Sequence, residues 1–352
     1  MKVALLFAIL FGVGFIPATN AGAATASVAG PNDFGNFNLR YFADPGEAND
    51  VFVDLSDDFS GVDVSDSGAT ITPGAGCVTV TAHKVHCDIS TSVGRVNASL
   101  GDGNDILSIS SGLETEGGRL SGGDGDDRIR GNDSAGTHEV LLGGRGDDSL
   151  FGRGGSEFLD GGPGADDLSG GTSCESGTAG QCFIDSDTVS YAGRVRNIRA
   201  DADADAADDG QRGEGDTIFA DVERIVGGKG NDHLGGITTN FFAFGSRRLV
   251  GMELIGGEGD DHLNGGRAPD TLVGGPGKDV IHGAGQGDGL QGGRGDDRLE
   301  GGSGRDRLSG GKGQDRLLAR DGHADRVNGG PGKDAAQVDP TLDHVARVEN
   351  LF

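Results

Sequence analysis

The residues best placed for chemistry are aspartates that recur every nine positions. From Gly256 the chain runs through seven consecutive nonapeptides without an insertion: GGEGDDHLN, GGRAPDTLV, GGPGKDVIH, GAGQGDGLQ, GGRGDDRLE, GGSGRDRLS and GGKGQDRLL. Position 6 is aspartate in each of them, from Asp261 to Asp315. Carboxylates repeated with one strict period are suited to a hard divalent cation such as Ca²⁺, which takes about six to eight oxygen ligands.

Apolar residues with the same period indicate the elements that position these aspartates. Position 8 is apolar in all seven nonapeptides and holds Leu263, Leu272, Ile281, Leu290, Leu299, Leu308 and Leu317. A three-residue strand with one apolar centre can bury a single side chain in a narrow solenoid. The remaining residues must turn the chain, and glycines supply the positive φ angles for that turn. The period therefore predicts an all-β solenoid of short strands and glycine-rich loops.

Stacking the coils of this solenoid would place matching aspartates about 4.8 Å apart, the strand spacing. Like charges at that distance would prevent stacking unless a cation lay between them. All-oxygen ligands favour Ca²⁺ over zinc or copper, and Mg²⁺ prefers to keep its waters. The alternative is a disordered acidic chain, although disorder requires no apolar residue at every ninth position. Without the ion we expect disorder, because charge repulsion and glycine entropy oppose a thin core.

The overall composition agrees with this picture. Of 352 residues 70 are glycine, and 56 acidic residues against 29 basic ones give a net charge of -27. That charge argues against nucleic acid and anionic membranes as partners. Neither a G-x-S-x-G elbow nor a G-x-x-x-x-G-K-[ST] loop is present, and His138-Glu139 lacks the second histidine of a metalloprotease helix. We therefore expect no enzyme and no catalytic residue.

The first residues predict a secretory signal peptide. Lys2 precedes an apolar run from Val3 to Ile16, and small residues then offer cleavage after Ala23 or Ala26. The run is shorter than the 20 or so residues, about 30 Å, that a membrane-spanning helix needs. We therefore expect residues 1–26 to be removed and the mature chain to be extracellular, without membrane insertion.

The four cysteines fit an oxidising compartment. Cys77 and Cys87 bracket a short hairpin-like stretch, and Cys174 and Cys182 bracket a Gly/Ser/Thr-rich loop. Two local disulfides, Cys77–Cys87 and Cys174–Cys182, are the simplest of the connectivities that four cysteines allow. The alternative is a metal site in CVTVTAHKVHC, where two histidines lie between the cysteines.

The pattern G-G-x-G-x-D-x-U-x, in which U is a large apolar residue, resembles the hemolysin-type (RTX) calcium-binding repeat. Further copies occur as LGDGNDILS from Leu100, GGDGDDRIR from Gly122, an unbroken run from Gly143 and GGKGNDHLG from Gly227. The chain looks most like the secreted actinobacterial members that have no attached toxin or enzyme domain. Two further stretches also resemble members of this family, LRYFADPGEANDVFVDL and DTVSYAGR.

The resemblance implies a right-handed parallel β-roll in which two nonapeptides make one coil and Ca²⁺ lies between the loops of repeats n and n+2. The implied ligands are the aspartates of position 6: Asp105, Asp127, Asp148, Asp166, Asp232, Asp261, Asp270, Asp279, Asp288, Asp297, Asp306, Asp315, Asp325 and Asp334, with Glu157 in the equivalent place of an irregular repeat. Carbonyl oxygens of positions 2 and 4 would complete the shells, for example those of Gly257, Gly259, Gly275, Gly277, Gly293 and Gly295.

Two loops depart from the family pattern. GGRAPDTLV has Ala268 where a glycine is expected, and GAGQGDGLQ has Ala284 and Gln286. Both loops belong to the same side of the implied roll, and we expect them to bind Ca²⁺ weakly.

We expect six segments. They are a signal peptide (1–26), an N-terminal β region (27–97), a first roll block (98–170), an irregular insertion with a disulfide (171–226), a second roll block (227–337) and a C-terminal cap or tail (338–352). Six aromatic residues of the N-terminal region predict a small core that caps the roll: Phe34, Phe37, Tyr41, Phe42, Phe52 and Phe59.

Two further stretches are less regular. DADADAADDGQRGE resembles an EF-hand loop at Asp201, Asp203 and Asp205, but lacks the required glycine at Ala206 and the acidic residue at Arg212. We therefore interpret this stretch as either a solvated acidic loop or an irregular calcium site. The aromatic stretch 241–244 is expected to pack on the roll, with an exposed contact as the alternative.

Together these features predict a secreted, non-enzymatic calcium-binding protein that folds when the ion binds outside the cell. Extracellular modules bind Ca²⁺ with dissociation constants of about 10⁻⁴ to 10⁻³ M, and binding energy then becomes folding energy. The alternative function is a cell-surface adhesion or matrix module that uses the roll as a calcium-rigidified scaffold. The sequence names no protein partner.

Overall fold

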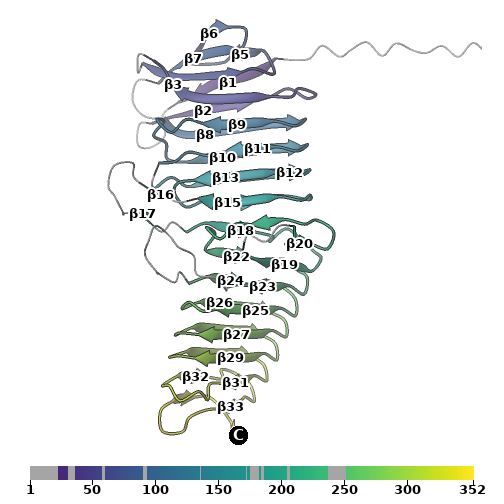
Figure 1. Cartoon of the computed structure of the whole chain (residues 1–352), viewed down its shortest axis with the longest axis vertical. Coiled ribbons are helices and arrows are strands. Elements are labelled where there is room, and N and C mark those ends of the chain that lie inside the picture. The colour runs from purple at the N-terminus through teal and green to yellow at the C-terminus, as the bar shows by residue number, and fades with distance from the viewer. Residues whose placement is uncertain are drawn as a thin grey trace, which may run out of the picture.

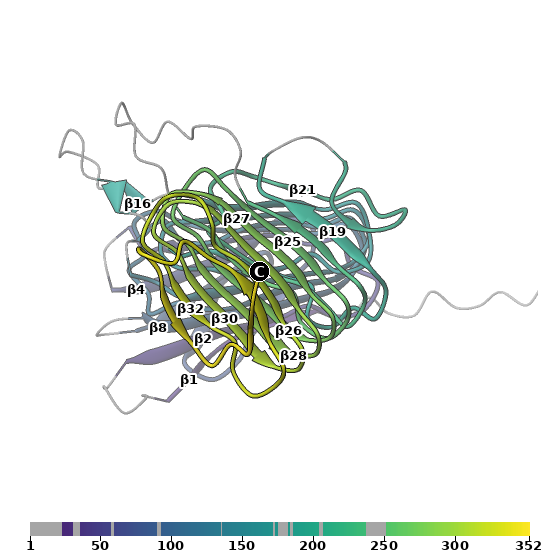
Figure 2. The same cartoon turned by 90° about the horizontal axis from the view of Figure 1, so that it is seen from below.

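A computed structural model of the chain describes residues 23–30, 36–57, 60–89, 93–134, 136–171, 173–174, 182–183, 186–203, 207–236 and 251–352. Strands are the regular elements of these residues, and they stack into one elongated solenoid with the C-terminus at its far end (Figure 1). Viewed from that end, the coils superimpose along the axis, with β16 projecting from one edge (Figure 2). The predicted all-β parallel roll is confirmed.

One face of the solenoid is a continuous sheet, called here the long sheet. Its order is β34-β32-β30-β28-β26-β24-β22-β18-β14-β12-β10-β8-β2-β1-β5. The strands are β34 (His344–Ala346), β32 (Arg326–Asn328), β30 (Arg307–Lys312), β28 (Gly289–Arg294), β26 (Thr271–Pro276), β24 (Glu253–Ile255), β22 (Arg224–Val226), β18 (Thr188–Ser190), β14 (Phe158–Asp160), β12 (Glu139–Arg145), β10 (Gly118–Asp124), β8 (Val93–Asp102), β2 (Phe37–Phe42), β1 (Ala24–Ala29) and β5 (Ile71–Pro73).

The opposite face is divided into two nine-stranded sheets. The N-terminal short sheet contains β21 (Thr217–Ile218), β15 (Asp167–Gly171), β13 (Ser149–Arg153), β11 (Arg128–Arg130), β9 (Ile106–Ile109), β3 (Asp50–Leu55), β4 (Gly61–Asp66), β7 (Lys84–Asp88) and β6 (Cys77–Thr81). The C-terminal short sheet contains β20 (Gly210–Gln211), β19 (Ile198–Asp201), β23 (His233–Gly235), β25 (His262–Gly266), β27 (Val280–Gly285), β29 (Arg298–Ser303), β31 (Arg316–Leu318), β33 (Ala335–Gln337) and β35 (Asn350–Leu351). β16 (Ser173–Cys174) and β17 (Cys182–Phe183) pair separately.

The register shows why the nine-residue period makes two strands per coil. In the long sheet Leu272 pairs in parallel with Leu290, and Leu290 with Leu308. Each pair is two nonapeptides apart, so alternate repeats stack on one face and the intervening repeats stack on the other. This is the arrangement of two repeats per coil that the resemblance implied.

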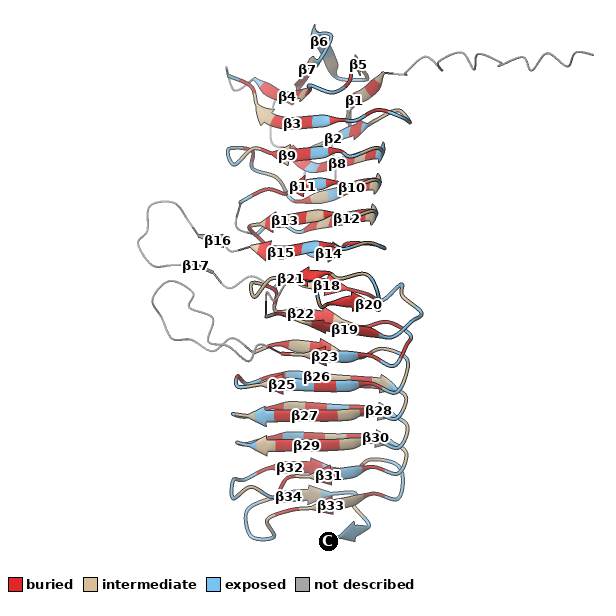
Figure 3. Ribbon diagram, turned by 45° about the vertical axis from the view of Figure 1, so that its right-hand side comes forward, coloured by how far each residue is buried: buried red, intermediate tan, exposed pale blue. Residues whose placement is uncertain are grey.

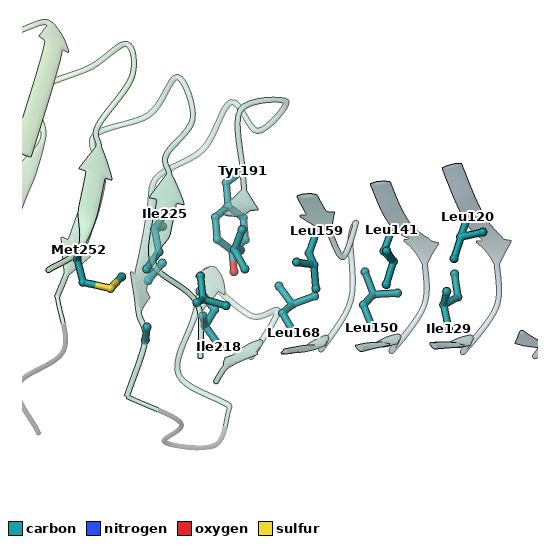
Figure 4. Close-up of a cluster of buried hydrophobic side chains, with 14 of the residues drawn as sticks. Leu120, Ile129, Leu141, Leu150, Leu159, Leu168, Tyr191, Ile218, Ile225 and Met252 are labelled. Carbon is teal, nitrogen blue, oxygen red and sulfur yellow. The ribbon is translucent and has the colours of Figure 1, made fainter. Parts of the chain in front are cut away.

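The core is a double column of apolar side chains between the two faces. Position 8 side chains such as Leu272, Ile281 and Leu299 have no exposed surface. Burial alternates along the strands of the repeats (Figure 3), and facing pairs such as Leu141 and Leu150 fill the interior (Figure 4). Burial of a leucine side chain contributes about 1.5–3 kcal/mol, so one such residue per repeat makes a thin core. The inward orientation predicted for position 8 is confirmed.

The N-terminal end of the solenoid contains antiparallel strands. β1 pairs antiparallel with β2, and β4 pairs antiparallel with both β3 and β7. Tyr41 is buried and its hydroxyl donates to Asp66. The predicted aromatic core is wrong for Phe42 and Phe52, which are 50 % and 43 % exposed on outward strand positions. Phe34 and Phe59 lie outside the described residues.

The boundary between the two short sheets lies where the order of strands in space differs from their order in the chain. β19 joins the C-terminal short sheet through β23, whereas the later strand β21 joins the N-terminal short sheet through β15. Asp209 bridges the interruption, because its Oδ1 accepts the Asp201 N–H (2.8 Å) and its Oδ2 accepts the Ile218 N–H (3.0 Å). Across from it the long sheet continues unbroken from β14 through β18 to β22.

Among the described residues no helix is long and apolar enough to cross a membrane.

Candidate metal sites

The loops between strands approach one another so closely that glycine is favoured at positions 2 and 4. Gly275 and Gly277 have φ angles of 122° and 156°, which L side chains rarely adopt. A Cβ on Gly275 would overlap the carbonyl oxygen of Gly257, and one on Gly277 would overlap that of Gly259. The carbonyl oxygens expected to bind Ca²⁺ therefore point toward the matching loop of the next coil.

The position 6 aspartates form two rows along the solenoid, called here the carboxylate ladders. In the ladder beside the short sheets, Asp279 Oδ1 accepts the backbone N–H of Asp261, and Asp297 Oδ1 accepts that of Asp279, both at 2.9 Å. Beside the long sheet, Asp288 Oδ1 accepts the N–H of Asp270 at 2.8 Å. One carboxylate oxygen of each aspartate thus joins consecutive coils.

The second oxygen of these carboxylates is buried and accepts no hydrogen bond. This holds for Oδ2 of Asp105, Asp127, Asp148, Asp166, Asp261, Asp270, Asp279, Asp288, Asp297, Asp306, Asp315, Asp325 and Asp334. All of these residues are at most 3 % exposed. Asp232 differs, because its Oδ2 accepts the Gly228 N–H at 2.6 Å. A buried carboxylate without a partner is strongly unfavourable, so these rows of oxygen atoms require either protons or cations.

Position 1 glycines leave room for these free oxygens. A Cβ on Gly283 would overlap Oδ2 of Asp288 and would lie 2.5 Å from the carbonyl oxygen of Gly301 in the next coil. A Cβ on Gly265 would lie 2.6 Å from Oδ2 of Asp270 and 2.8 Å from the Gly283 carbonyl oxygen. Carboxylate and carbonyl oxygens of adjacent coils therefore converge beside the same α-carbon.

Burial raises the pKa of several ladder aspartates. It brings the pKa of Asp261 to about 6 and that of Asp279 to about 7, although the N–H donor to each carboxylate acts in the opposite direction. Burial likewise raises the pKa of Asp166 to about 8, with neighbouring Asp216 and Asp148 adding to the effect. The folded chain without cations therefore holds these protons to a higher pH than the unfolded chain does.

The structure extends both ladders to acidic residues that the nonapeptide pattern did not identify. Asp166 donates its N–H to Asp216 Oδ1 (3.1 Å), Asp325 to Asp343 Oδ1 (3.0 Å) and Asp334 to Glu349 Oε2 (2.7 Å). Asp187 and Glu223 occupy the same place before β18 and β22. Glu139 is the first residue of β12, and its Oε2 accepts the Asn132 N–H. Their common signal is an acidic residue two positions before an apolar one, as in Asp216-Thr217-Ile218, although the apolar residue is not always buried, since Leu351 after Glu349 is 61 % exposed.

The two loops that depart from the pattern differ from each other. Ala284 and Gln286 have φ angles of 78° and 72°, so they occupy the left-handed region that glycine fills elsewhere. Ala268 is not in this region, because the following Pro269 disfavours it. The Asp270 and Asp288 carboxylates nevertheless remain in the ladder, where they accept the N–H groups of Met252 and Asp270.

The first cysteine pair is a disulfide, with Cys77 and Cys87 joined across β6 and β7. The metal site considered for this hairpin is therefore wrong. Its two histidines also have separate partners, since His83 Nδ1 lies 2.7 Å from the Ala69 carbonyl oxygen and His86 Nδ1 lies 2.9 Å from Asp63 Oδ1.

Some predictions concern residues that the structure does not describe. Cys174 and Cys182 are directly opposite in the β16–β17 pair, but their side chains lie outside the described part, so the second disulfide stays a prediction. Asp205 of the EF-hand-like loop and the aromatic stretch 241–244 are also outside it.

Calcium fits the donor set better than a transition metal does. Within the described ranges no three His, Cys, Asp or Glu side chains form a cluster of their own, so a cation would need backbone carbonyl oxygens in addition to the aspartates. The free Oδ2 atoms and the converging carbonyls are hard oxygen donors, the set that Ca²⁺ prefers. The ligand roles of the individual aspartates and glycines stay predictions.

Comparison with known families agrees with this chemistry. The chain matches the family described as RTX calcium-binding nonapeptide repeat (4 copies) over residues 118–135, 135–168, 217–236, 255–290 and 287–317. No curated protein matches it. The matched family is a calcium-binding repeat, and these ranges contain most of the ladder aspartates. Both the stacked nonapeptides and this match show that the chain contains RTX-type calcium-binding nonapeptide repeats.

Proposed function

We propose that this is an exported calcium-binding protein whose roll is completed by the ion outside the cell. The observation that supports it most is the pair of carboxylate ladders, in which thirteen predicted ligand aspartates keep one oxygen buried without a hydrogen bond. Such a row is unfavourable as free carboxylates, and a divalent cation would balance its charge.

Each part of the repeat has its own role in this function. Asp279 and its equivalents would hold the ion with Oδ2 while Oδ1 fixes the register through the N–H of the preceding coil. Glycines at positions 1, 2 and 4 keep carbonyl oxygens close to the ladder. Bound Ca²⁺ would supply the positive charge that the buried carboxylates lack.

Calcium binding and folding should therefore be one process. The thin apolar core must offset the entropy of an unusually glycine-rich chain as well as the burial of two rows of acids. Low calcium inside the cell would keep the chain unfolded for export, and higher calcium outside would assemble the roll.

Circular dichroism of the full mature chain tests this coupling. We expect a spectrum of disordered chain in EDTA and a β spectrum after addition of Ca²⁺, with Mg²⁺ at the same concentration having little effect. Native mass spectrometry and isothermal titration would then count the bound ions. A β spectrum that persists in EDTA at neutral pH would contradict the proposal.

For export, we predict cleavage after Ala23 rather than after Ala26. β1 starts at Ala24, and both Ala24 and Ala26 are fully buried between β2 and β5. Cleavage after Ala26 would remove half of this strand, whereas cleavage after Ala23 preserves it. N-terminal sequencing of the exported protein should therefore read Ala-Thr-Ala-Ser. A mature chain beginning at Ser27 would show that β1 is not needed.

A further inference from the structure

The outer surface of the long sheet has a groove near the C-terminal end. It has a volume of about 620 Å³ and crosses β26, β28, β30, β32 and β34. Its floor is formed by sheet backbone and by the outward positions 7 and 9 of stacked repeats. The acidic side chains of the carboxylate ladders are absent from its lining.

A departure from the repeat pattern makes this surface hollow. Position 7 of consecutive coils forms a column in register: Thr271, Gly289, Arg307, Arg326 and His344. Gly289 has no positive φ angle, and a Cβ added there would meet only the Asp270 carbonyl oxygen, at 3.9 Å. Neither turn geometry nor close packing requires glycine at this position, and its missing side chain opens the column.

The groove is cationic, in contrast to the molecule as a whole. Arg307, Arg326, Arg347 and His344 line it, and no acidic residue does. All four are exposed, and within the described chain none of their side chains has an ion pair or a hydrogen bond. A group of unpaired arginines is unexpected in a chain with a net charge of -27.

The equivalent arginines on the opposite face are different, because they have partners. Arg298 forms an ion pair with Glu300 at 3.0 Å. Arg316 lies over the ring of Phe352, 4.7 Å from its centroid. Both occupy position 7 of their repeats, so the repeat itself does not dictate unpaired arginines.

A second column in the groove supplies neutral hydrogen-bonding groups. Gln291, Ser309 and Asn328 occupy position 9 in register, next to the cationic column. Guanidinium groups pair well with carboxylates, and amides and hydroxyls suit sugar hydroxyls. The two columns repeat at the strand spacing of about 4.8 Å, so they match an extended polymer that carries both groups.

We propose that this groove binds an extended acidic polysaccharide, with carboxylates on the arginine column and hydroxyls on the amide column. Single-stranded nucleic acid fits less well, because the groove has no Phe, Tyr or Trp on which bases could stack. An acidic peptide that adds as a strand would need the sheet edge at β34, whereas the rest of the groove crosses β26, β28, β30 and β32, which are paired on both sides.

Binding to fluorescent glucuronate-containing oligosaccharides (hyaluronan fragments) tests the proposal on the calcium-loaded full chain. The double variant Arg307→Ser/Arg326→Ser should weaken binding about tenfold or more, since it removes two charge-assisted contacts. The matched control Arg298→Ser/Arg316→Ser removes the same charge from the opposite face and should bind like the unmodified chain. Circular dichroism in Ca²⁺ confirms that each variant is folded.

Several outcomes would overturn the proposal. One is no binding by the folded, calcium-loaded chain, and another is an equal loss in the control variant. Equally tight binding of neutral dextran would exclude recognition by charge. Tighter binding of polyglutamate or single-stranded DNA that depends on Arg307 and Arg326 would assign the groove to another class of polymer.

Discussion

At the scale of the residue, the two oxygens of each ladder aspartate have different roles. Asp279 shows this division, because its Oδ1 accepts the N–H of Asp261 while its Oδ2 is buried without a hydrogen bond. An asparagine could keep the first contact through its carbonyl oxygen, but it would replace the second oxygen with an amide that cannot bind a cation. Register and ion binding can therefore be separated experimentally.

The substitution Asp279→Asn should remove at least one bound Ca²⁺ and preserve the β spectrum at saturating calcium. A site held at one hundred times its dissociation constant contributes about 2.7 kcal/mol, which sets the expected loss of calcium-loaded stability. Native mass spectrometry counts the ions, and denaturant unfolding measures the loss. Asp296→Asn is the control, because Asp296 is an exposed partner of Lys278. An unchanged ion count in Asp279→Asn would contradict the ligand role.

Ala284 and Gln286 allow a test of backbone strain. A non-glycine residue in the left-handed region costs about 1–2 kcal/mol, so Ala284→Gly and Gln286→Gly should each raise calcium-loaded stability by about 1 kcal/mol after the entropy loss of about 0.4–1 kcal/mol for glycine. Ala268→Gly is the matched control, because φ of Ala268 is not positive. It should be destabilising, as measured by urea unfolding in Ca²⁺. Stabilisation by all three changes would rule out strain as the cause.

At the scale of the element, periodicity predicted the regular coils because one local rule repeats in them. The inward leucines, the two repeats per coil and the position 6 aspartates all follow from a single nine-residue pattern. The ladder residues Asp216 and Glu349 were missed because they lack the glycines of positions 1, 2 and 4 and keep only the acid-x-apolar signal. The sequence could not predict that β19 joins the C-terminal short sheet while the later strand β21 joins the N-terminal one. This arrangement depends on long-range pairing with β23 and β15.

We expect Asp209 to stabilise the boundary between the two short sheets. Both of its oxygens accept backbone N–H groups, one from each short sheet. Asp209→Asn would place an amide donor against one of these N–H groups, so we expect a loss of about 1–3 kcal/mol. Asp208→Asn breaks only the partly exposed ion pair with Arg199 and should cost at most about 1 kcal/mol. Equal unfolding midpoints in denaturant would show that Asp209 does not bridge the sheets.

At the scale of the whole molecule, the ladders couple stability to pH. Burial raises the pKa of Asp279 and Asp288 to about 7 in the folded chain, against about 3.9 for an unfolded aspartate. The folded state then binds more protons, so the calcium-free roll is most stable below about pH 4 and loses that stability as the pH rises through about 7.

Acidification should therefore partly replace Ca²⁺. In EDTA we expect the β signal in circular dichroism to increase as the pH falls from about 8 toward about 4. This range spans the folded and unfolded pKa values of the ladder aspartates. With Ca²⁺ present, its apparent affinity should fall over the same range, because protons compete for the carboxylates. Chloride and sulfate salts at constant pH serve as the control for charge screening. A calcium-free chain that stays disordered at low pH would contradict this coupling.

The interruption of one face between β19 and β21 has a mechanical consequence. Hydrogen bonds between strands run along the solenoid axis, so tension between the two ends pulls directly on them. Most coils resist through two sheets, but at the interruption the long sheet is supported, within the described residues, only by the isolated bridge between Asp209 and Asp216 and by the side-chain contacts of Asp209. Stretching should therefore separate the molecule there first, giving two halves that extend independently. The protein would then act as two stiff rods joined by a weaker link.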